Sequence, residues 1–449
     1  SFRNQDNEQT FSLRRILRGA SIYSAGEVLV RSSGFLIIPI YTRVLTPAEY
    51  GIVGYLQVIL QVATVLVGFG THGAQTRFLY ETVDDAEGVG KFAFTANLIP
   101  VTICLLVGVP LTIAGTVLGW HLGSHAIPFH PFLVLTIWSV LLQALANNAV
   151  AWYRARQRFT LATVLQVSRF LSITAGTLVL ILWFELGALG RVAGVFFGLL
   201  VFVPTTFVGY AKNFVWRPSR YAFAYALSFG GPLVVHALAS QLHNLIDRII
   251  LERFVSLDEL GLYTLAFQLG NTLNLFMHAF NQAYQPSFFR LMGSTNGNKH
   301  LQIVKVFKTW LALMTLIAML GITLGRPFLD VFAGPRFAQT AGVFPWIIFA
   351  MFAGGFYYFF SAPIFFYKRT QWLPAITGLS VLVNVICNLI LIPRLGIIGA
   401  AIGTVISHLV LSVSSLFVGM RFQSVSWPWR WIALAMAMVA SSLLFVVLG

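Results

Sequence analysis

The hexapeptide Thr46-Pro47-Ala48-Glu49-Tyr50-Gly51 returns 210 positions later as Ser256-Leu257-Asp258-Glu259-Leu260-Gly261. In both copies an arginine stands three residues ahead, and a segment bearing a tyrosine and a glutamine follows. Later parts of the two halves also match, because Leu186–Gly194 (LGALGRVAG) corresponds to Leu395–Gly403 (LGIIGAAIG). The chain has therefore been duplicated.

The composition places this duplicated chain in a membrane. Of its 449 residues, 57% are hydrophobic and only 10% are charged, and the mean hydropathy is +0.80. A soluble protein could not bury so much apolar surface, so we expect an all-α polytopic membrane protein. An internal repeat of this size in a membrane protein usually indicates a two-lobed transporter with its site between the lobes.

About thirteen apolar segments have the roughly 20 residues that a helix needs to cross the hydrocarbon. Their centres lie near residues 28, 58, 103, 141, 171, 199, 237, 270, 313, 349, 381, 408 and 438. Twelve of them form two pseudo-symmetric six-helix lobes, at residues 1–212 and 213–422, and residues 423–449 form an additional transmembrane helix. Whether a fourteenth helix follows Gly449 is left open.

The distribution of basic residues predicts the orientation. About 20 of the 29 Lys and Arg residues lie at the amino terminus or in even-numbered connections, which places the amino terminus in the cytoplasm. The net charge of +15 then reflects topology and attraction to anionic lipid. Membrane lipid is thus an expected partner, and nucleic acid is not.

No enzymatic site, metal or cofactor is expected. Every connection is short, so there is no room for a soluble catalytic domain. Gly88–Phe92 lacks the upstream glycine and the hydroxyl residue of a phosphate-binding loop. His121, His125 and His130 have a spacing that could hold a metal, but without a nearby carboxylate or thiolate they indicate an interfacial loop.

Polar residues inside apolar segments are the candidate site, because ionisable groups at membrane depth are costly and usually face a polar cavity. Glu27 and Arg31 stand one helical turn apart on the first segment. We expect a substrate-binding cavity lined by Glu27, Arg31, Asn147, Asn148, Arg169, Asn244, Asp247, Arg248, Asn274 and His278. The aromatic run Phe356–Phe360 could pack along sugars, although such runs more often face lipid.

Several of these residues allow a second interpretation. Glu27 and Arg31 could form a structural ion pair, and Arg248 could snorkel from the outer end of its helix. Arg77 and Glu81 could be a cytoplasmic gate or simple anchors. Glu27 and Asp247 are the candidates for coupling transport to an ion. Two further groups of residues indicate helix packing instead, namely Asn384 with Asn388 and the glycine pairs Gly190/Gly194 and Gly399/Gly403.

The two halves differ where they carry charge. At an offset of 210 residues, Glu27 and Arg31 align with Ala237 and Gln241, and Asp247 and Arg248 align with Ile37 and Ile38. Scaffold residues repeat, whereas the intramembrane charges do not. This pattern is typical of duplication followed by specialisation for an asymmetric solute.

The chain resembles the polysaccharide transporter (Wzx-type) family of the multidrug/oligosaccharidyl-lipid/polysaccharide (MOP) exporter superfamily. The resemblance covers nearly the whole chain. It is carried by Arg43–Gly51, Arg77–Glu81, Asp247–Tyr263, Pro286–Arg290 and, most specifically, Asn384–Gly403 with its asparagines, Pro393 and its Gly-Ile-Ile-Gly-Ala-Ala sequence. The resemblance implies two six-helix lobes facing each other in a V, as in MATE-like exporters.

The same resemblance implies a function. Members of the family flip undecaprenyl-diphosphate-linked oligosaccharides from the cytoplasmic to the periplasmic leaflet of the bacterial inner membrane, for O-antigen, capsule or exopolysaccharide synthesis. Cationic residues meet the diphosphate, and Arg31 and Arg169 are the best candidates here. A polysaccharide polymerase is a further partner that the resemblance suggests. The chain should act as a monomer, because it contains both lobes.

Driving force and rival functions stay open. Membrane potential, an H⁺ gradient or a Na⁺ gradient could each drive flipping. The nearest alternative is a cation-coupled multidrug exporter of the same fold, whose cavity should be rich in acidic residues rather than arginine. An alternative of another class is a membrane-embedded polysaccharide polymerase or ligase, which would need a larger outer loop than this chain has.

Overall fold

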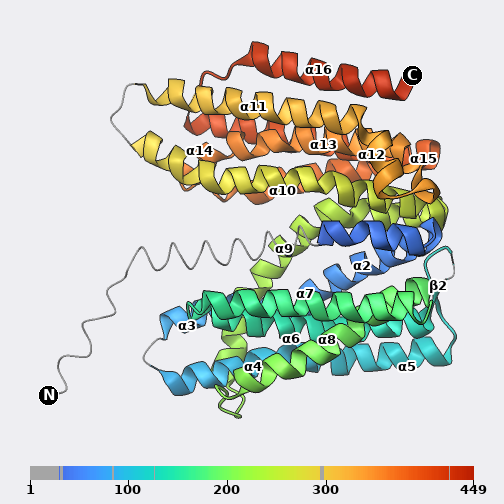
Figure 1. Cartoon of the computed structure of the whole chain (residues 1–449). Coiled ribbons are helices and arrows are strands. Elements are labelled where there is room, and N and C mark those ends of the chain that lie inside the picture. Colours follow the sequence, from blue (N-terminus) through green and yellow to red (C-terminus); the bar gives the residue numbers. More distant parts are fainter. Residues whose placement is uncertain are drawn as a thin grey trace. The chain divides into compact units, whose positions relative to one another are not determined.

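The structure is a computed structural model that describes residues 30, 34–82, 85–125, 127–293, 298–423 and 425–448, without the side chains of His236, Ser240 and Asn244. These residues are almost entirely helical (Figure 1). The one ladder among them pairs β1 (His121–Leu122) with β2 (Ile127–Pro128) in antiparallel orientation. The expectation of an all-α polytopic protein is confirmed.

The chain divides into two compact units. The first unit contains Ile59–Leu122 and Ala126–Leu238, and the second contains Ile38–Val58, Gly123–His125 and Ala239–Gly449. Two helices contribute to both units, namely α2 (Pro47–Gly68) and α9 (Arg220–Phe254).

Helices of the first unit follow one another through short connections. They are α3 (Thr71–Glu81), α4 (Ala86–Ile103), a π-helical turn (Cys104–Gly108), α5 (Val109–Val117), a second π-helical turn (Phe129–Leu133), α6 (Val134–Ala155), α7 (Phe159–Leu182) and α8 (Gly187–Ala211). A core of large side chains joins α3, α4, α6 and α8, in which Phe92, Trp152 and Tyr210 are fully buried.

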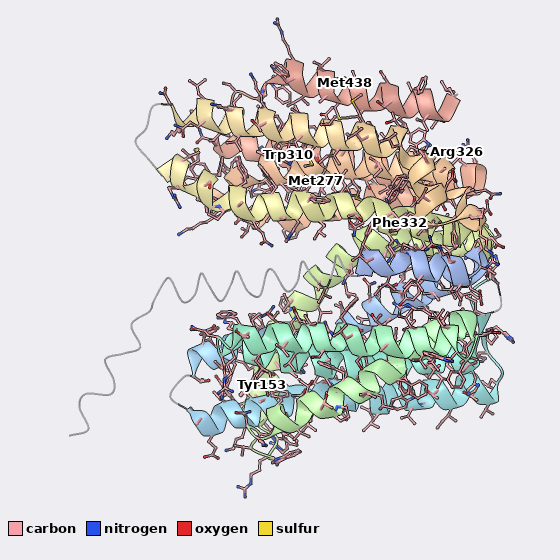
Figure 2. The ribbon with its side chains drawn as sticks, viewed as in Figure 1. Tyr153, Met277, Trp310, Arg326, Phe332 and Met438 are labelled. Atoms are coloured by element: carbon pink, nitrogen blue, oxygen red, sulfur yellow. The ribbon has the colours of Figure 1, made fainter. Side chains whose placement is uncertain are left out.

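The second unit contains the two longest helices of the described residues, α10 (Leu257–Gly293) and α15 (Trp372–Phe422). Its helices from Leu257 onward are α10, α11 (Lys299–Thr323), α12 (Gly325–Phe332), a 3₁₀ turn (Pro335–Phe337), α13 (Thr340–Phe360), α14 (Ala362–Phe366), α15 and α16 (Trp429–Leu448). Met277 of α10 and Trp310 of α11 are buried between these helices (Figure 2). Phe356, Phe359 and Phe360 of α13 belong to the same core, so they face neither lipid nor a sugar.

Each expected segment from residue 58 onward contains a helix. Within the described residues, ten helices are long and apolar enough to span a membrane. The segments expected near 381 and 408 form one element, α15, which Gly396 interrupts with a φ of 57°. Helix α10, in the segment expected near 270, is not among the ten, and it carries a row of polar side chains. The segment expected near residue 28 lies mostly outside the described residues.

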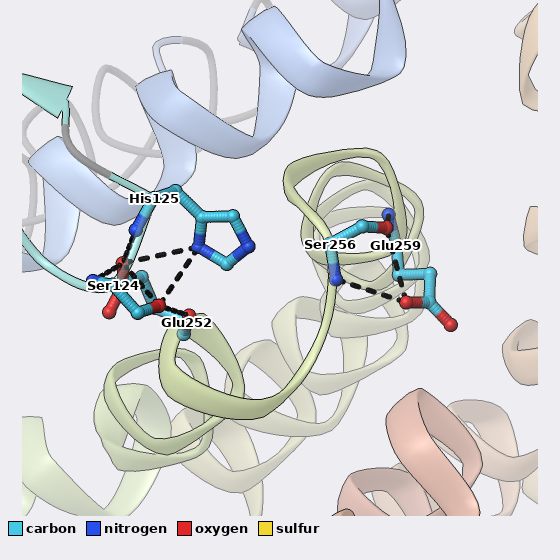
Figure 3. A network of polar contacts seen from close by, with 5 residues as sticks. All are labelled: Ser124, His125, Glu252, Ser256 and Glu259. Atoms are coloured by element: carbon cyan, nitrogen blue, oxygen red, sulfur yellow. Dashed lines mark hydrogen bonds and ion pairs between the residues drawn. The ribbon is translucent and has the colours of Figure 1, made fainter.

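Both copies of the repeated hexapeptide begin a helix in the same way. The Thr46 amide donates to Glu49 Oε2 (2.9 Å), and the Glu49 amide donates to Thr46 Oγ1 (3.2 Å). The Ser256 amide donates to Glu259 Oε2 (3.1 Å), and the Glu259 amide donates to Ser256 Oγ (3.2 Å; Figure 3). Each reciprocal pair satisfies two of the amides that a helix start leaves without partners. The repeat is thus a pair of capping boxes at the starts of α2 and α10.

The glycines that end the two hexapeptides pack against each other's helices within the second unit. A Cβ added at Gly51 would overlap the carbonyl oxygen of Leu257, and one added at Gly261 would overlap that of Pro47. Only glycine allows two backbones to approach so closely. The duplicated sequence therefore builds a pseudo-symmetric crossing of α2 and α10.

The second pair of repeated sequences, Leu186–Gly194 and Leu395–Gly403, also has the same backbone conformation at its first glycine. Gly187 and Gly396 both adopt positive φ, at 50° and 57°. A Cβ at Gly194 would overlap the Thr177 backbone, and one at Gly403 would lie 2.6 Å from Asn388 Oδ1. A Cβ at Gly190 would lie 3.1 Å from the Leu180 backbone, and one at Gly399 would overlap the Leu391 carbonyl oxygen. The interpretation of both glycine pairs as close helix packing is therefore confirmed.

Candidate functional site

Gln143 and Asn147 of α6 and Arg169 of α7 lie together in the first unit, and we call this group the cationic face. Arg169 Nη1 donates to Asn147 Oδ1 (2.9 Å), and Gln143 Nε2 approaches the same oxygen (3.4 Å). All three side chains are half-buried. Because α7 meets the length and hydropathy of a membrane span, a guanidinium at this position needs a polar environment. The structure brings together two of the expected cavity residues here.

Asn148 stands next to Asn147 in the sequence but points elsewhere. It is 1% exposed, accepts a hydrogen bond from Thr71 Oγ1 (2.9 Å), and donates to the Ala96 carbonyl and to Asn97 Oδ1 (3.3 Å each). Tyr210 extends this network by donating to Gln75 Oε1 (2.7 Å). The expected cavity position of Asn148 is therefore corrected to an interhelical packing position in the core of the first unit.

The Arg77–Glu81 pair ties two helices together. Arg77 Nε lies 2.6 Å from Glu81 Oε1, one turn away on α3, and both side chains are exposed. Tyr225 of α9 donates to Glu81 Oε2 (2.6 Å), and the Arg77 guanidinium lies 5.2 Å from the ring centre of Phe229. The pair is thus a contact between α3 and the first-unit part of α9, and its role as a gate stays a prediction.

A buried acidic site lies in the second unit, where α9, α10 and α15 meet. Asp247 is 1% exposed, and its Oδ2 accepts hydrogen bonds from the Tyr263 hydroxyl and, at 3.4 Å, from Thr404 Oγ1. No described residue bonds its Oδ1. Arg248 is also buried, with its guanidinium 4.5 Å from the ring centre of Phe267, so it does not snorkel. A buried carboxylate with a spare oxygen can take up a proton or a small cation.

A row of polar side chains runs along one face of α10. Asn271, Asn274, His278 and Gln282 follow at spacings of three and four, and all but the half-buried Asn274 are exposed. Asn274 donates to Asn271 (3.3 Å), Gln282 contacts His278 (3.3 Å), and the Tyr358 hydroxyl donates to Asn274 Oδ1 (3.0 Å). An exposed polar face among membrane helices is typical of a water-filled cavity. The expected residues Asn274 and His278 lie on this face.

The two asparagines of the first half of α15 join it to the second half. Asn388 Nδ2 donates to Asn384 Oδ1 (3.0 Å), and Asn384 Nδ2 donates to Ser407 Oγ (3.3 Å). Both asparagines are fully buried. Their interpretation as interhelical hydrogen-bonding residues is confirmed.

Sequence reasoning missed a polar contact of the β1–β2 loop. Glu252 of α9 is buried and accepts hydrogen bonds from the Ser124 amide (2.7 Å) and the His125 amide (3.3 Å), while His125 Nδ1 lies 3.4 Å from the carboxylate (Figure 3). The carboxylate that the histidine loop lacked in sequence comes from a helix 127 residues away. No local pattern could have revealed it.

Three expected site residues are not placed by the structure, and the transport roles of all the expected site residues stay predictions. Glu27 and Arg31 lie outside the described residues, as does the side chain of Asn244. Among the residues that the structure describes, no group of three His, Cys, Asp or Glu side chains could hold a metal ion.

Several known proteins are similar to this chain. The profile of a family described as "Polysaccharide biosynthesis protein" matches residues 16–292. An "Uncharacterized membrane protein" of Haemophilus influenzae is 26% identical over 284 residues, which cover 61% of this chain and 65% of that protein. "Lsg locus putative protein 1" of the same organism is 24% identical over 420 residues, covering 86% of this chain and 95% of that protein.

Two further likenesses carry more descriptive names. "Probable low-salt glycan biosynthesis flippase Agl15" of Haloferax volcanii is 23% identical over 417 residues, covering 90% of this chain and 83% of that protein. A solved structure described as "Lipid II flippase MurJ, inward closed conformation" has a TM-score of 0.74 at 14% identity, covering 95% of this chain and 91% of that one. The two chains share a fold.

Proposed function

We propose that this chain, which belongs to the polysaccharide biosynthesis protein family, is a flippase that moves a lipid-linked oligosaccharide across a membrane. The proposed substrate is undecaprenyl-diphosphate-linked oligosaccharide, moved from the cytoplasmic to the periplasmic leaflet of a bacterial inner membrane by alternating access. Support comes from the family, from a relative named as a glycan biosynthesis flippase and from the fold shared with a lipid II flippase.

The observation that carries the proposal is the position of Arg169, a guanidinium within a helix long and apolar enough to span a membrane. A diphosphate does not cross hydrocarbon unaided, because removing each charge from water costs several kcal/mol even after relaxation. A guanidinium offers paired N–H donors whose geometry matches phosphate oxygens. Asn147 orients the Arg169 guanidinium through one of its N–H groups. This face of the first unit is therefore suited to the head group.

The membrane potential is a sufficient driving force. Moving one negative charge outward across an inside-negative membrane releases about 2.3 kcal/mol per 100 mV. A diphosphate that crosses without full charge compensation is therefore driven by voltage. Asp247 offers a second source of energy, because proton or Na⁺ uptake at its carboxylate would change the charge that Tyr263 and Thr404 stabilise. Arg77, Glu81 and Tyr225 form the proposed cytoplasmic gate.

The test reconstitutes purified protein in liposomes that carry undecaprenyl-diphosphate oligosaccharide in one leaflet. We expect the glycan to become accessible on the other side, faster when the donor side is negative. Arg169→Ala should slow this about 10- to 100-fold, the effect of losing one charge-assisted hydrogen bond worth roughly 1.5–3 kcal/mol. Arg169→Lys, which keeps the charge but not the fork, should be intermediate.

The same liposomes distinguish the proposed flippase from the rival function, a cation-coupled multidrug exporter. A cation-coupled multidrug exporter would leave the lipid in place and accumulate a cationic dye in response to a proton or sodium gradient. That result would overturn the flippase proposal, and Asp247→Asn would then be expected to abolish dye uptake. Dye exclusion together with glycan movement would support the proposal.

A further inference from the structure

A second polar site lies within the second unit, apart from Asp247. A partly open cavity of about 210 Å³ is lined by residues of four helices. Its polar lining comes from His243 of α9, Asn274 of α10, Tyr357 and Tyr358 of α13, and Thr377 and His408 of α15. At about 30 Å³ per water molecule, the cavity has room for roughly seven waters or for one small polar ligand.

The two histidines are the unusual part of this cavity. His243 is 9% exposed, and neither of its ring nitrogens has a hydrogen-bond partner among the described residues. Its ring centre lies 5.0 Å from that of His408. His408 Nδ1 donates to the Thr404 carbonyl (2.9 Å), so Nε2 is the acceptor nitrogen of the neutral ring.

An unsatisfied buried imidazole weakens a fold. A buried polar group without a hydrogen-bond partner lowers the free energy of unfolding by about 1–3 kcal/mol, whereas an apolar side chain of the same shape carries no such penalty. Helix packing alone therefore does not explain a histidine at position 243. A ligand that bonds to the ring would explain it.

The lining identifies the kind of ligand. The described lining residues include no Asp, Glu, Lys or Arg, so the cavity is unsuited to a diphosphate or a free cation. Two histidines without a third ligand do not make a metal site. Imidazole, amide, hydroxyl and phenol groups both donate and accept, as the hydroxyls of a sugar require. The rings of Tyr357 and Tyr358 add flat surfaces for the apolar face of a sugar ring.

The cavity also continues a face that the flippase already offers to solvent. Asn274 lines the cavity and belongs to the polar row of α10, where it accepts a hydrogen bond from Tyr358. A glycan that follows this row thus meets polar side chains up to the cavity.

We infer that the cavity of His243 and His408 is a subsite for one monosaccharide unit of the transported glycan and that it selects among glycans. The inference rests on the proposed flippase function. Binding of a sugar hydroxyl to His243 gives its imidazole the partner that it lacks among the described residues, and the acceptor Nε2 of His408 is placed to receive a second hydroxyl. A glycan without a matching hydroxyl leaves His243 unsatisfied and is discriminated against.

The test measures binding and flipping with two probes. One is bare undecaprenyl diphosphate, and the other is the lipid-linked oligosaccharide extracted from the source strain after deletion of this gene. The full-length protein is purified as wild type and as the variants Thr377→Trp, which fills the cavity from its rim, and His243→Phe. Leu379→Trp is the matched control, because it adds the same side chain to α15 at a position that is 47% exposed.

Wild type should bind the oligosaccharide lipid more tightly than the bare lipid. Thr377→Trp and His243→Phe should each remove that preference, weakening binding of the oligosaccharide lipid roughly tenfold and leaving bare lipid within about twofold. Leu379→Trp should behave as wild type. Thr377 is half-exposed, so its variant decides the question if His243→Phe does not fold.

Three results would overturn the subsite: a wild type without preference, variants that keep the preference, or variants that lose both lipids equally. In each case movement of lipid by the wild type would leave the flippase proposal intact. A wild type that moves neither lipid would instead refute the proposed function, and the subsite with it.

Discussion

Asn147 and Asn148 are neighbours in sequence with opposite environments, which makes them a matched pair for testing the site. Replacing each by alanine removes the same atoms from the same helix. We expect Asn148→Ala to lower stability and Asn147→Ala to lower transport. The two residues point about 100° apart around α6, so each is the control for the other.

The size of the stability effect follows from the contacts. The Asn148 side chain takes part in three hydrogen bonds, with Thr71, the Ala96 carbonyl and Asn97. At about 0.6 kcal/mol for each interhelical hydrogen bond in a membrane protein, their loss costs roughly 2 kcal/mol. Thr71 keeps a second acceptor, the Gly68 carbonyl (2.7 Å), so its hydroxyl is not orphaned. The contacts of Asn147 are half-exposed, so its loss costs less than about 1 kcal/mol.

Titration of the purified protein with sodium dodecyl sulfate in mixed micelles, followed by tryptophan fluorescence, measures the free energy of unfolding. The liposome assay measures transport per folded molecule. Asn147→Ala should slow transport about tenfold, because Arg169 loses the group that orients it. Equal stability losses in the two variants, or a transport defect confined to Asn148→Ala, would refute the assignment of one asparagine to the core and the other to the cationic face.

Three further predictions test other parts of the structure. Gly261→Ala should lower the free energy of unfolding by about 1–3 kcal/mol, whereas Gly378→Ala, where an added Cβ meets nothing within 4 Å, should not lower it in the same titration. Glu81→Gln weakens a hydrogen bond from Tyr225 and should change the transport rate but not substrate affinity; an altered affinity alone would argue against a gate. Glu252→Gln should speed hydrogen exchange at the amides of residues 124 and 125, and unchanged protection would contradict the contact.

Most of the fold could be predicted from sequence because its signals are local. Apolar length alone located the helices, and the repeat located their equivalent starts. Helix α10 shows the limit of composition, since its polar row takes it below the hydropathy of its neighbours. The segment near residue 270 was still counted among the thirteen apolar segments, and the hexapeptide Ser256–Gly261 marks the beginning of its helix.

The site could be predicted less well, because a polar residue in an apolar helix does not reveal which way it faces. Asn147 and Asn148 looked alike in sequence, and only packing separates a half-exposed side chain from a buried one. His243 and His408 were missed because 165 residues separate them. A signal existed for His243, which lies one helical turn from Asp247, a residue already expected in the site.

The duplication explains why packing was easier to predict than chemistry. Contacts between the two copies, such as that of Gly51 with Gly261, need both partners. A substitution in one copy therefore changes the packing of the other. Asp247 and Arg248 have no such counterpart, because the aligned positions hold Ile37 and Ile38. The proposed substrate has an anionic end and a neutral sugar end, and a site for such a solute gains nothing from symmetry. Positions where polar groups break the repeat are therefore the places to look for substrate contacts in this chain.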